Sequence, residues 1–240
     1  MLDVEWVAAP DEGGSMENKV WYLQRSRLFA EVPEASVVSS EHLFVTCLFP
    51  KRSLVFDQGD SGRVVYLIKR GKVRLSRLTP EGKEVTIAIL GAGDFFGEET
   101  LFETGVRTTV AQCLEESLLC SARADDLFAL LSADPTLALN VAKMLSTRLG
   151  DASATMEDLA YAKVTDRLMH LFARLAAEHG VPDAGDAVKL DVHLTHAEIA
   201  SLIGSTRETV SLELSNLMRA GRIALRDGAI VLPRAELEAL

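Results

Sequence analysis

The segment that most restricts the fold of this chain is LTHAEIASLIGSTRETVSLELSNLMRAGRI, which starts at Leu194. Thr195 and Thr206 each precede a run of helical spacing, where a threonine hydroxyl can cap the free amides of the first turn. Gly204 lies between the two runs and can form the sharp turn that joins them. The apolar positions expected to face inward are Ile199, Leu202, Ile203, Val210, Leu214 and Leu217. The segment therefore predicts two short helices joined by a tight turn.

A β-hairpin is predicted directly after these helices. Ile223–Arg226 and Ile230–Leu232 flank Asp227-Gly228, a pair that suits a two-residue hairpin turn. Two helices with a tight turn, followed by a small hairpin, are typical of a winged helix-turn-helix, whose second helix enters the major groove of DNA. The sequence thus predicts a DNA-binding unit at the C-terminal end of the chain.

The first turn of the second helix would face base edges. Arg207 can read guanine, Glu208 can accept from cytosine, and Ser211 lies on the same face. The hydroxyl groups expected to reach phosphates belong to Thr195, Thr206 and Thr209.

The net charge of the chain is unusual for a DNA-binding protein. The sequence has 25 Lys and Arg against 35 Asp and Glu, a formal net charge of −10. From Lys163 onward, nine basic residues stand against eleven acidic ones, which leaves −8 on the first 162 residues. DNA affinity must then rest on a local cluster rather than on a basic surface. The candidates are Arg207, Arg219, Arg222 and Arg226.

An all-β module is predicted from about Leu43 to Ala122. Short β-rich runs such as FVTCLF and VVYLIKRGKVRLSRL alternate with turn signals, among them Gly59, Gly71 and Gly82. The spacing of the runs predicts a barrel or a sandwich.

One long helix is predicted after this module. Pro135 suits the first helical position, and no proline interrupts the chain before about Tyr161. Apolar residues recur at steps of three and four, the pattern of a seam against a partner helix. They are Val141, Leu145, Leu149, Ala152, Met156 and Leu159. The pattern favours a homodimer, and the alternative is a helix that packs on its own domain.

Other kinds of site find little support in the sequence. Cys47, Cys113 and Cys120 lack metal-ligand spacing and are expected to be buried thiols. His193 and His196 have no nearby third ligand, so no metal is expected. No nucleophile and base accompany the acidic residues, which argues against an enzyme. No membrane span or signal peptide is recognisable, so we expect a cytoplasmic protein without a membrane partner.

Two motifs in fixed order extend the interpretation to the whole chain. The first is FDQGD, the Gly71 turn and GDFFGEETLFETGVRTT; the second is GSTRETVS. From about Trp21 to Leu232 the chain resembles the catabolite activator and fumarate-nitrate reduction regulator (CRP/FNR) family of transcription regulators. The resemblance implies an α+β fold with a cyclic-nucleotide-binding, jelly-roll-like β-roll, a long dimerisation helix and a winged helix-turn-helix.

The resemblance also implies a division of the chain. Residues 1–18 would be a flexible tail, with Met16 as an alternative translation start. Residues 19–134 would be the effector-sensing β-roll and 135–162 the dimerisation helix. Residues 163–240 would be the DNA-binding domain.

The family's cyclic-nucleotide site falls on five residues of this chain. These are Gly97, Glu98, Arg107, Thr108 and Ser153. By resemblance, Arg107 and Thr108 would hold the cyclic phosphate, as a cationic and a hydroxyl donor can, and Glu98 would accept a ribose hydroxyl. The expected cofactor is cAMP or another cyclic nucleotide.

Three departures from the family pattern bear on these expectations. The segment from Glu98 to Arg107 is one residue shorter than in the best-known enteric activator. Ala152-Ser153 stands where the family has the Thr-Ser pair that contacts adenine, so one hydroxyl is missing. Leu212 replaces a recognition-helix arginine, and an aliphatic side chain cannot donate to guanine.

The resemblance implies a dimer, gated by its effector, that binds a pseudo-palindromic site in double-stranded DNA and bends it. It also implies contact with RNA polymerase, for which the exposed loop Val181–Asp186 is one candidate surface. Two alternatives stay open. One is a family member that needs no ligand, in which Arg107 pairs with Glu98. The other is a cyclic-nucleotide-responsive module whose C-terminal domain binds protein.

Overall fold

The computed structural model describes residues 16–102 and 105–239, and the expectations for residues 1–15 lie outside this range. Helix α1 (Met16–Arg25) begins at Met16. Residues 16–18 therefore belong to a helix, whereas the sequence assigned them to the tail. In an α-helix, each amide donates to the carbonyl four residues earlier. A helix in which the Val20 amide is bonded must therefore begin about four residues before Val20.

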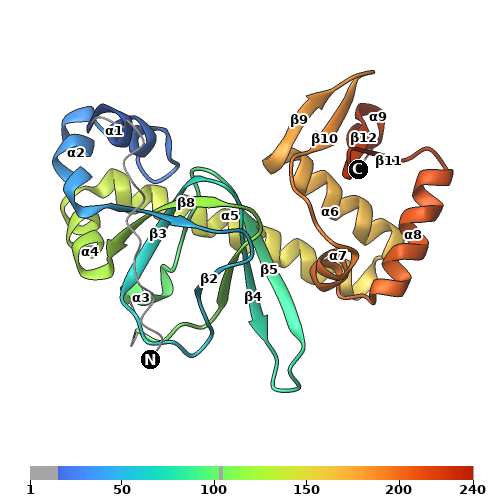
Figure 1. Cartoon of the computed structure of the whole chain (residues 1–240), viewed down its shortest axis with the longest axis horizontal. Helices are drawn as coiled ribbons and strands as arrows, with labels where there is room; N and C mark the ends of the chain where they lie inside the picture. The colour runs from blue at the N-terminus through green and yellow to red at the C-terminus, as the bar shows by residue number, and fades with distance from the viewer. Residues whose placement is uncertain (1–15, 103–104, 240) are drawn as a thin grey trace. The chain divides into compact units, whose positions relative to one another are not determined.

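The chain divides into two compact units, Met1–Gly82 with Ala88–Arg148 and Lys83–Ile87 with Leu149–Leu240. Figure 1 traces the elements of both units along the chain.

Two four-stranded sheets make up most of the N-terminal unit, as the β-rich runs predicted, and only residues 84–87 of β5 are assigned to the other unit. The pairs β1–β8, β3–β8, β3–β6, β2–β7 and β4–β7 are antiparallel. In sheet order the first sheet holds β1 (Val45–Phe49), β8 (Ser117–Arg123), β3 (Val64–Arg70) and β6 (Phe95–Phe96). The second holds β2 (Leu54–Phe56), β7 (Val110–Cys113), β4 (Val73–Leu78) and β5 (Glu84–Leu90).

Strand β3 shows how the period-two alternation of a strand separates two cores. Tyr66 and Ile68 point between the sheets, where they pack with Phe96 and other apolar residues. Val65 and Leu67 point to the opposite face and pack against helices. Both faces of this strand are buried, which explains its nearly continuous apolar sequence.

Short helices cover the outer face of the first sheet. They are α2 (Glu34–Ser40), the 3-10 turn η1 (Glu41–Leu43), α3 (Glu99–Phe102) and α4 (Ala124–Ala133). Figure 1 shows α1, α2 and α4 gathered at one end of the β-roll.

The predicted long helix is confirmed as α5 (Pro135–Tyr161), 27 residues long. Its first half packs on the β-roll through Leu137, Val141 and Met144. Beyond Arg148 the apolar stripe is exposed, with Leu149 at 67% and Met156 at 61% of the accessible surface. The predicted seam thus has two parts, one buried in its own domain and one facing solvent.

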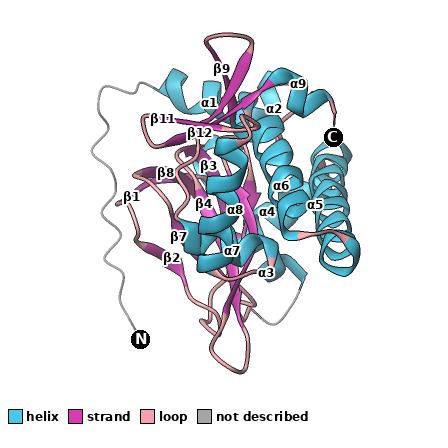
Figure 2. Ribbon diagram, turned by 90° about the vertical axis from the view of Figure 1, so that its right-hand side faces the viewer, coloured by secondary structure: helices cyan, strands magenta, loops and turns pink. Residues whose placement is uncertain are grey.

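The C-terminal unit combines helices with a four-stranded sheet in the order β11-β12-β10-β9 (magenta in Figure 2). Its elements are α6 (Val164–His179), β9 (Gly180–Asp183), β10 (Ala187–Leu190), α7 (His196–Ile203), α8 (Arg207–Arg219), β11 (Ala224–Arg226), β12 (Ala229–Pro233) and α9 (Arg234–Glu238). Phe172 of α6, Ile199 of α7 and Leu214 of α8 are buried, so each of the three helices turns an apolar face inward.

The proline and glycine of Val181–Asp186 suggested a loop, but the structure has a strand and a turn there. Strand β9 pairs with β10, and Pro182 lies opposite Val188. Proline has no amide to donate, but β9 is an edge strand and can accommodate it there. The expected surface for RNA polymerase is therefore a β-hairpin with its turn at Ala184–Asp186.

Candidate functional site

The conformation of Gly97 shapes the first candidate site, where β6 leads into α3. Gly97 has a φ of 84°, which favours glycine. A Cβ atom at this position would lie 2.9 Å from Nη1 of Arg107 and 3.1 Å from the carbonyl oxygen of Val64. Glycine is needed here for both its backbone angle and the close approach of the arginine.

Arg107 lies buried beneath this turn, with 3% of its surface accessible. Its Nη1 donates to the Gly97 carbonyl at 3.3 Å, and its Nη2 donates to the carbonyl of Val64. The guanidinium carbon is 4.0 Å from the centre of the Phe56 ring, within the range of a cation–π contact. The protein therefore holds a positive charge at a defined place inside the β-roll.

Two adjacent carboxylates contact two different arginines. Oε1 of Glu99 lies 3.5 Å from Nη1 of Arg107. Oε1 of Glu98 accepts from Arg148 of α5 at 2.7 Å, and Arg148 also donates to the carbonyl of Phe95. The pair that the sequence suggested between Arg107 and Glu98 is replaced by pairs with Glu99 and Arg148. Sequence reasoning missed Arg148, because nothing in its local sequence relates it to a residue 50 positions earlier.

The burial of these carboxylates affects their chemistry. Loss of water around Glu99 raises the pKa of its carboxyl group, although Arg107 opposes that rise. Oε2 of Glu98 is buried and has no hydrogen-bond partner among the described residues. A buried carboxylate oxygen without a donor is costly, so this atom is suited to accept from a bound hydroxyl group.

The structure brings together three of the five predicted ligand residues, Gly97, Glu98 and Arg107. Thr108 follows Arg107 and is half-buried. Ser153 is exposed on α5, where its hydroxyl donates to the carbonyl of Leu149 at 2.8 Å. Its role at the ligand stays a prediction.

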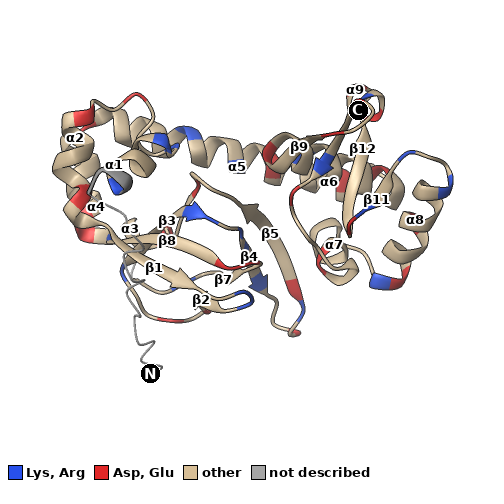
Figure 3. Ribbon diagram, turned by 45° about the horizontal axis from the view of Figure 1, so that its top comes forward, with Lys and Arg blue, Asp and Glu red and all other residues tan. Residues whose placement is uncertain are grey.

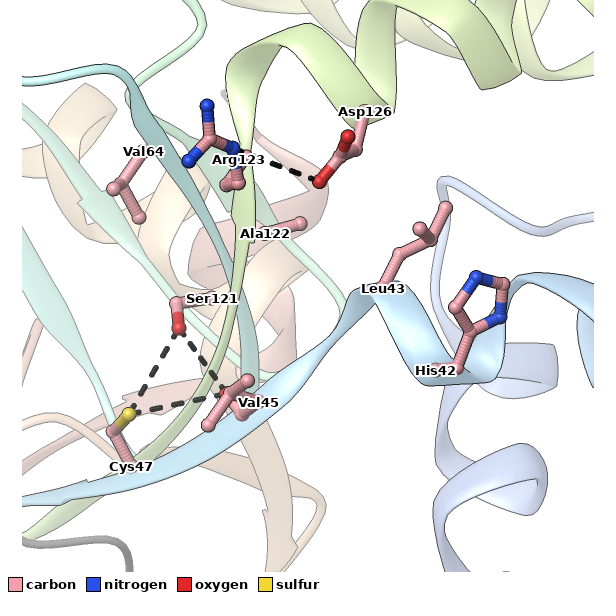
Figure 4. A pocket seen from close by; sticks show the side chains of 9 residues that line it. All are labelled: His42, Leu43, Val45, Cys47, Val64, Ser121, Ala122, Arg123 and Asp126. Atoms are coloured by element: carbon pink, nitrogen blue, oxygen red, sulfur yellow. Dashed lines mark hydrogen bonds and ion pairs between the residues drawn. The ribbon is translucent and has the colours of Figure 1, made fainter.

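A groove of about 490 Å³ lies elsewhere on the β-roll and is lined by the start of β1 and the end of β8 (Figure 4). Its polar side chains contact each other: Sγ of Cys47 lies 3.9 Å from Oγ of Ser121, and Arg123 lies 3.8 Å from Asp126. Its other lining residues are mostly apolar. The groove holds no charged group as deeply buried as Arg107, so the latter remains the better anion site.

The second candidate site is the pair of helices predicted from the sequence, which the structure confirms. Thr195 caps α7 in a capping box with Glu198: the Glu198 amide donates to the threonine hydroxyl, and the Thr195 amide donates to the carboxylate. Gly204 ends α7 in the left-handed conformation, with φ 59° and ψ 50°. Thr206 caps α8 by accepting from the Thr209 amide.

The predicted DNA-contacting side chains differ in their freedom to bind. Arg207 and Glu208 are exposed, and their side chains have no hydrogen bond or ion pair with the described residues. The Thr195 hydroxyl donates to Glu198 at 2.8 Å, so its proton is engaged in the cap. Oγ of Ser211 donates to the Arg207 carbonyl at 2.8 Å.

Thr206 and Thr209 share a hydrogen bond between their hydroxyl groups, at 2.9 Å. A shared bond uses the proton of one hydroxyl and leaves the other proton available. One of these two threonines can therefore still donate to a phosphate.

The expected basic cluster is only partly available. Arg222 pairs with Glu236 at 2.8 Å, and Arg226 pairs with Asp183 at 2.8 Å. Arg207 and Arg219 carry the positive charge at the two ends of α8 (Figure 3). Of the four candidate arginines, the two that form no ion pair with the described residues therefore both lie on α8.

The predicted hairpin follows α8. Strands β11 and β12 pair in antiparallel register, with Leu225 opposite Ile230. Asp227 and Gly228 both have positive φ, 51° and 77°, as a type I′ turn requires. The wing of a winged helix-turn-helix is therefore present.

Within 16–102 and 105–239, no helix is long and apolar enough to span a membrane. No group of three or more His, Cys, Asp or Glu in that range could hold a metal ion. Cys47, Cys113 and Cys120 are free and buried, as expected.

A family model for the cyclic nucleotide-binding domain matches residues 47–134, and one for the Crp-like helix-turn-helix domain matches residues 166–240. The chain is 32% identical to the cyclic AMP receptor protein of Thermus thermophilus over 215 residues, 90% of this chain and 96% of the relative. It is 29% identical to a CRP-like cAMP-activated global transcriptional regulator of Mycobacterium tuberculosis, over 89% and 95% of the two chains.

A solved structure is similar over most of its length. It is the c-di-GMP-responsive global regulator CLP of Xanthomonas campestris, with a TM-score of 0.73, 25% identity and coverage of 84% of this chain and 99% of that chain. Proteins of this kind regulate transcription and are not enzymes. With a nucleotide-binding β-roll, a long helix and a winged helix-turn-helix in this order, the chain belongs to the CRP/FNR family of transcription regulators.

Proposed function

We propose that this regulator binds a cyclic nucleotide in its β-roll and that the ligand controls its binding to DNA as a homodimer. The observation that carries the proposal is the combination of a buried cation at Arg107 with the buried Oε2 of Glu98, which has no hydrogen-bond partner among residues 16–102 and 105–239. A cyclic nucleotide has one anionic phosphodiester and one ribose hydroxyl that donates, so it offers a partner to each group.

The chemistry of the remaining residues fits this ligand. Thr108 follows Arg107 and supplies a hydroxyl on the same segment, and the short helix after Gly97 supplies amides. Phe56 holds the flat guanidinium from one side. When bound, the ligand would place its phosphate beside Arg107, whose guanidinium now contacts the Glu99 carboxylate at 3.5 Å.

The identity of the nucleotide rests on the relatives. Two of them are named as cAMP-dependent, and a third as responsive to c-di-GMP. We infer cAMP as the first candidate, since c-di-GMP is a much larger dianion. Ala152 lacks the hydroxyl that the family uses on the base, so discrimination between cAMP and cGMP would be weaker, with Ser153 as the remaining donor.

Calorimetric titration of cAMP, cGMP and c-di-GMP into the purified protein tests this proposal. Arg107→Ala should abolish binding of the correct ligand. Arg70→Ala should leave it unchanged, because Arg70 is an exposed residue of the same unit. Equal binding by wild type and Arg107→Ala would reject the site.

Dimerisation through α5 is supported by its exposed stripe beyond Arg148. Leu149, Met156 and Leu159 lie at helical spacing with 67%, 61% and 47% of their surfaces exposed, a pattern typical of a helix seam. Met156→Glu should lower the mass measured by light scattering to that of a monomer. Leu78→Glu adds the same charge at an exposed leucine of β4 and should leave the dimer intact.

A dimer of this kind would present two copies of α8 to successive major grooves, about 34 Å apart. The target would then be a pseudo-palindrome in double-stranded DNA, read by Arg207 and Glu208 and held through Thr206 or Thr209. Selection from random duplexes with and without cAMP should return a two-fold motif. We place such a protein in the cytoplasm and expect contact with RNA polymerase, for which the β9–β10 hairpin is a candidate surface.

Two observations favour other functions. The contacts of Arg107 with Gly97, Val64 and Glu99 could hold the β-roll without a ligand, as in a ligand-independent regulator. The ion pairs of Arg222 and Arg226 reduce the basic surface, as expected of a module that binds protein. DNA binding without any nucleotide would support the first, and failure to select any duplex would support the second.

A further inference from the structure

Glu99 is a charged residue of the ligand site that neither the sequence motifs nor the relatives assign. It lies on α3, next to Glu98, and its side chain is 17% exposed. Its carboxylate is 3.5 Å from Nη1 of Arg107, the cation to which an anionic ligand would bind. The guanidinium thus already has a buried counter-ion.

We propose that Glu99 competes with the phosphate of the ligand for Arg107, so that a cyclic nucleotide binds to this protein together with a proton taken up by Glu99. The inference rests on the proposed function and adds how binding at that site is regulated. When the phosphodiester anion approaches Arg107, it meets a carboxylate that is already there. Two anions cannot both remain charged next to one buried cation without a large cost.

Protonation removes this conflict at the smallest structural cost. One proton from solvent converts the Glu99 carboxylate to a neutral carboxylic acid, and the ligand phosphate takes over as counter-ion. The net charge of the buried site is then the same before and after binding. Burial already raises the pKa of Glu99 above its ordinary value, in the direction that favours the neutral acid.

The charged groups around Glu99 shift its pKa in opposite directions. Arg107 faces Glu99 and favours the carboxylate, while Glu98 lies beside it and disfavours a second negative charge. Arg148 of α5 contacts Glu98 at 2.7 Å and offsets part of that repulsion. An arriving phosphate adds a negative charge and draws Arg107 away from Glu99, and both changes raise the pKa of Glu99 further.

The sign of the pH dependence follows from linkage. Because the bound state holds one more proton than the free state, affinity falls as pH rises between the free and bound pKa of Glu99. At its steepest, Kd rises about tenfold for each pH unit. The cyclic phosphodiester stays a monoanion throughout, so the ligand's phosphate does not contribute to the slope.

The experiment is calorimetry of cAMP with the full chain at about pH 6 and about pH 8, in pairs of buffers with different ionisation enthalpies. The buffer dependence of the heat counts the protons taken up. We expect uptake approaching one proton per bound ligand for the wild-type protein. We also expect weaker binding at the higher pH.

Glu99→Gln keeps the shape of the side chain and removes its charge. It should bind cAMP at least tenfold more tightly than wild type at the higher pH, with no proton uptake and a flat pH profile. Glu116→Gln removes an exposed carboxylate from the same unit and should behave as wild type. Circular dichroism of each variant checks that it is folded, and the proton count on the wild-type protein does not depend on any variant.

The outcomes separate the two proposals. Two results support competition between Glu99 and the phosphate. Either Glu99→Gln binds cAMP and wild type does not, or Glu99→Gln binds more tightly and without pH dependence. Equal affinity and equal pH slope in wild type and Glu99→Gln overturn it while the ligand site stands. If neither protein binds a nucleotide at either pH, the proposed ligand itself is wrong, and this inference is overturned with it.

Discussion

Nη1 of Arg148 donates to Oε1 of Glu98 at 2.7 Å, and this bond ties the long helix α5 to the segment that holds the ligand site. The two residues are 50 positions apart in the sequence. Arg148 also donates to the Phe95 carbonyl, directly before the Gly97 turn. The bond therefore connects the candidate ligand site directly to the helix proposed as the dimer seam.

Arg148→Ala should destabilise the N-terminal unit by about 1–2 kcal/mol, because it leaves a mostly buried carboxylate without its cation. Arg70→Ala breaks a pair with Glu116 in which both side chains are more than 60% exposed. That control should cost less than about 0.5 kcal/mol. Urea unfolding measures the change in the free energy of unfolding for each variant. Similar changes would mean that the Arg148–Glu98 bond stabilises the protein no more than an exposed ion pair does.

Gly204→Ala should destabilise the C-terminal unit by about 1–2 kcal/mol. The residue has a φ of 59°, and an added Cβ would lie 2.6 Å from Cδ2 of Leu159. Gly150→Ala is the matched control, since its Cβ would meet no atom within 4 Å and α5 is helical there. The control should stabilise the protein by about 0.5–1 kcal/mol. Thermal unfolding distinguishes them, and two changes of the same sign would contradict the argument.

Leu212 should direct base preference toward thymine. Its side chain is 61% exposed, one turn after Glu208 on α8. An apolar side chain in the major groove can contact the thymine methyl group, whereas arginine reads guanine, and each such contact is worth about 1–3 kcal/mol. Duplex selection with Leu212→Arg should replace one A·T pair of each half-site by G·C.

Leu78→Arg serves as the control for Leu212→Arg, because it adds the same charge at an exposed leucine of the β-roll. It should select the same motif as wild type. A change of motif with both variants would mean that overall charge, and not the contact of Leu212, sets the preference.

Tyr66 should make the fold sensitive to alkaline pH. It stacks on Phe96, with ring centres 5.2 Å apart, and burial raises its pKa from 10.0 to about 12. The folded state then keeps a proton that the unfolded state loses above pH 10. The free energy of unfolding should therefore fall between pH 10 and 12, by about 1–3 kcal/mol from this residue.

Tyr66→Phe should remove that part of the decline, and denaturant unfolding at several alkaline pH values would measure the difference. Tyr161→Phe removes the same hydroxyl from a ring that is 88% exposed. The exposed variant should follow the wild-type curve. If the free energy of unfolding falls equally in wild type and Tyr66→Phe, groups other than Tyr66 cause the alkaline decline.

The sequence by itself determined the elements whose signals are local. Thr195, the turn at Gly204 and the Asp227-Gly228 pair predict a cap and turns within a few residues of themselves, and all formed as predicted. The long helix likewise follows from Pro135 and an uninterrupted helical stretch. Such features depend on backbone preferences and nearest neighbours, which a sequence displays directly.

Only the tertiary structure decided which groups face each other across the chain. It paired Arg148 with Glu98 and Arg107 with Glu99, and it paired β9 with β10 where proline and glycine had suggested a loop. It also divided the apolar stripe of α5 into a buried part before Arg148 and an exposed part after it. These outcomes depend on burial and on distances between residues far apart in the chain, because charge pairing and desolvation act through space and leave no local periodicity.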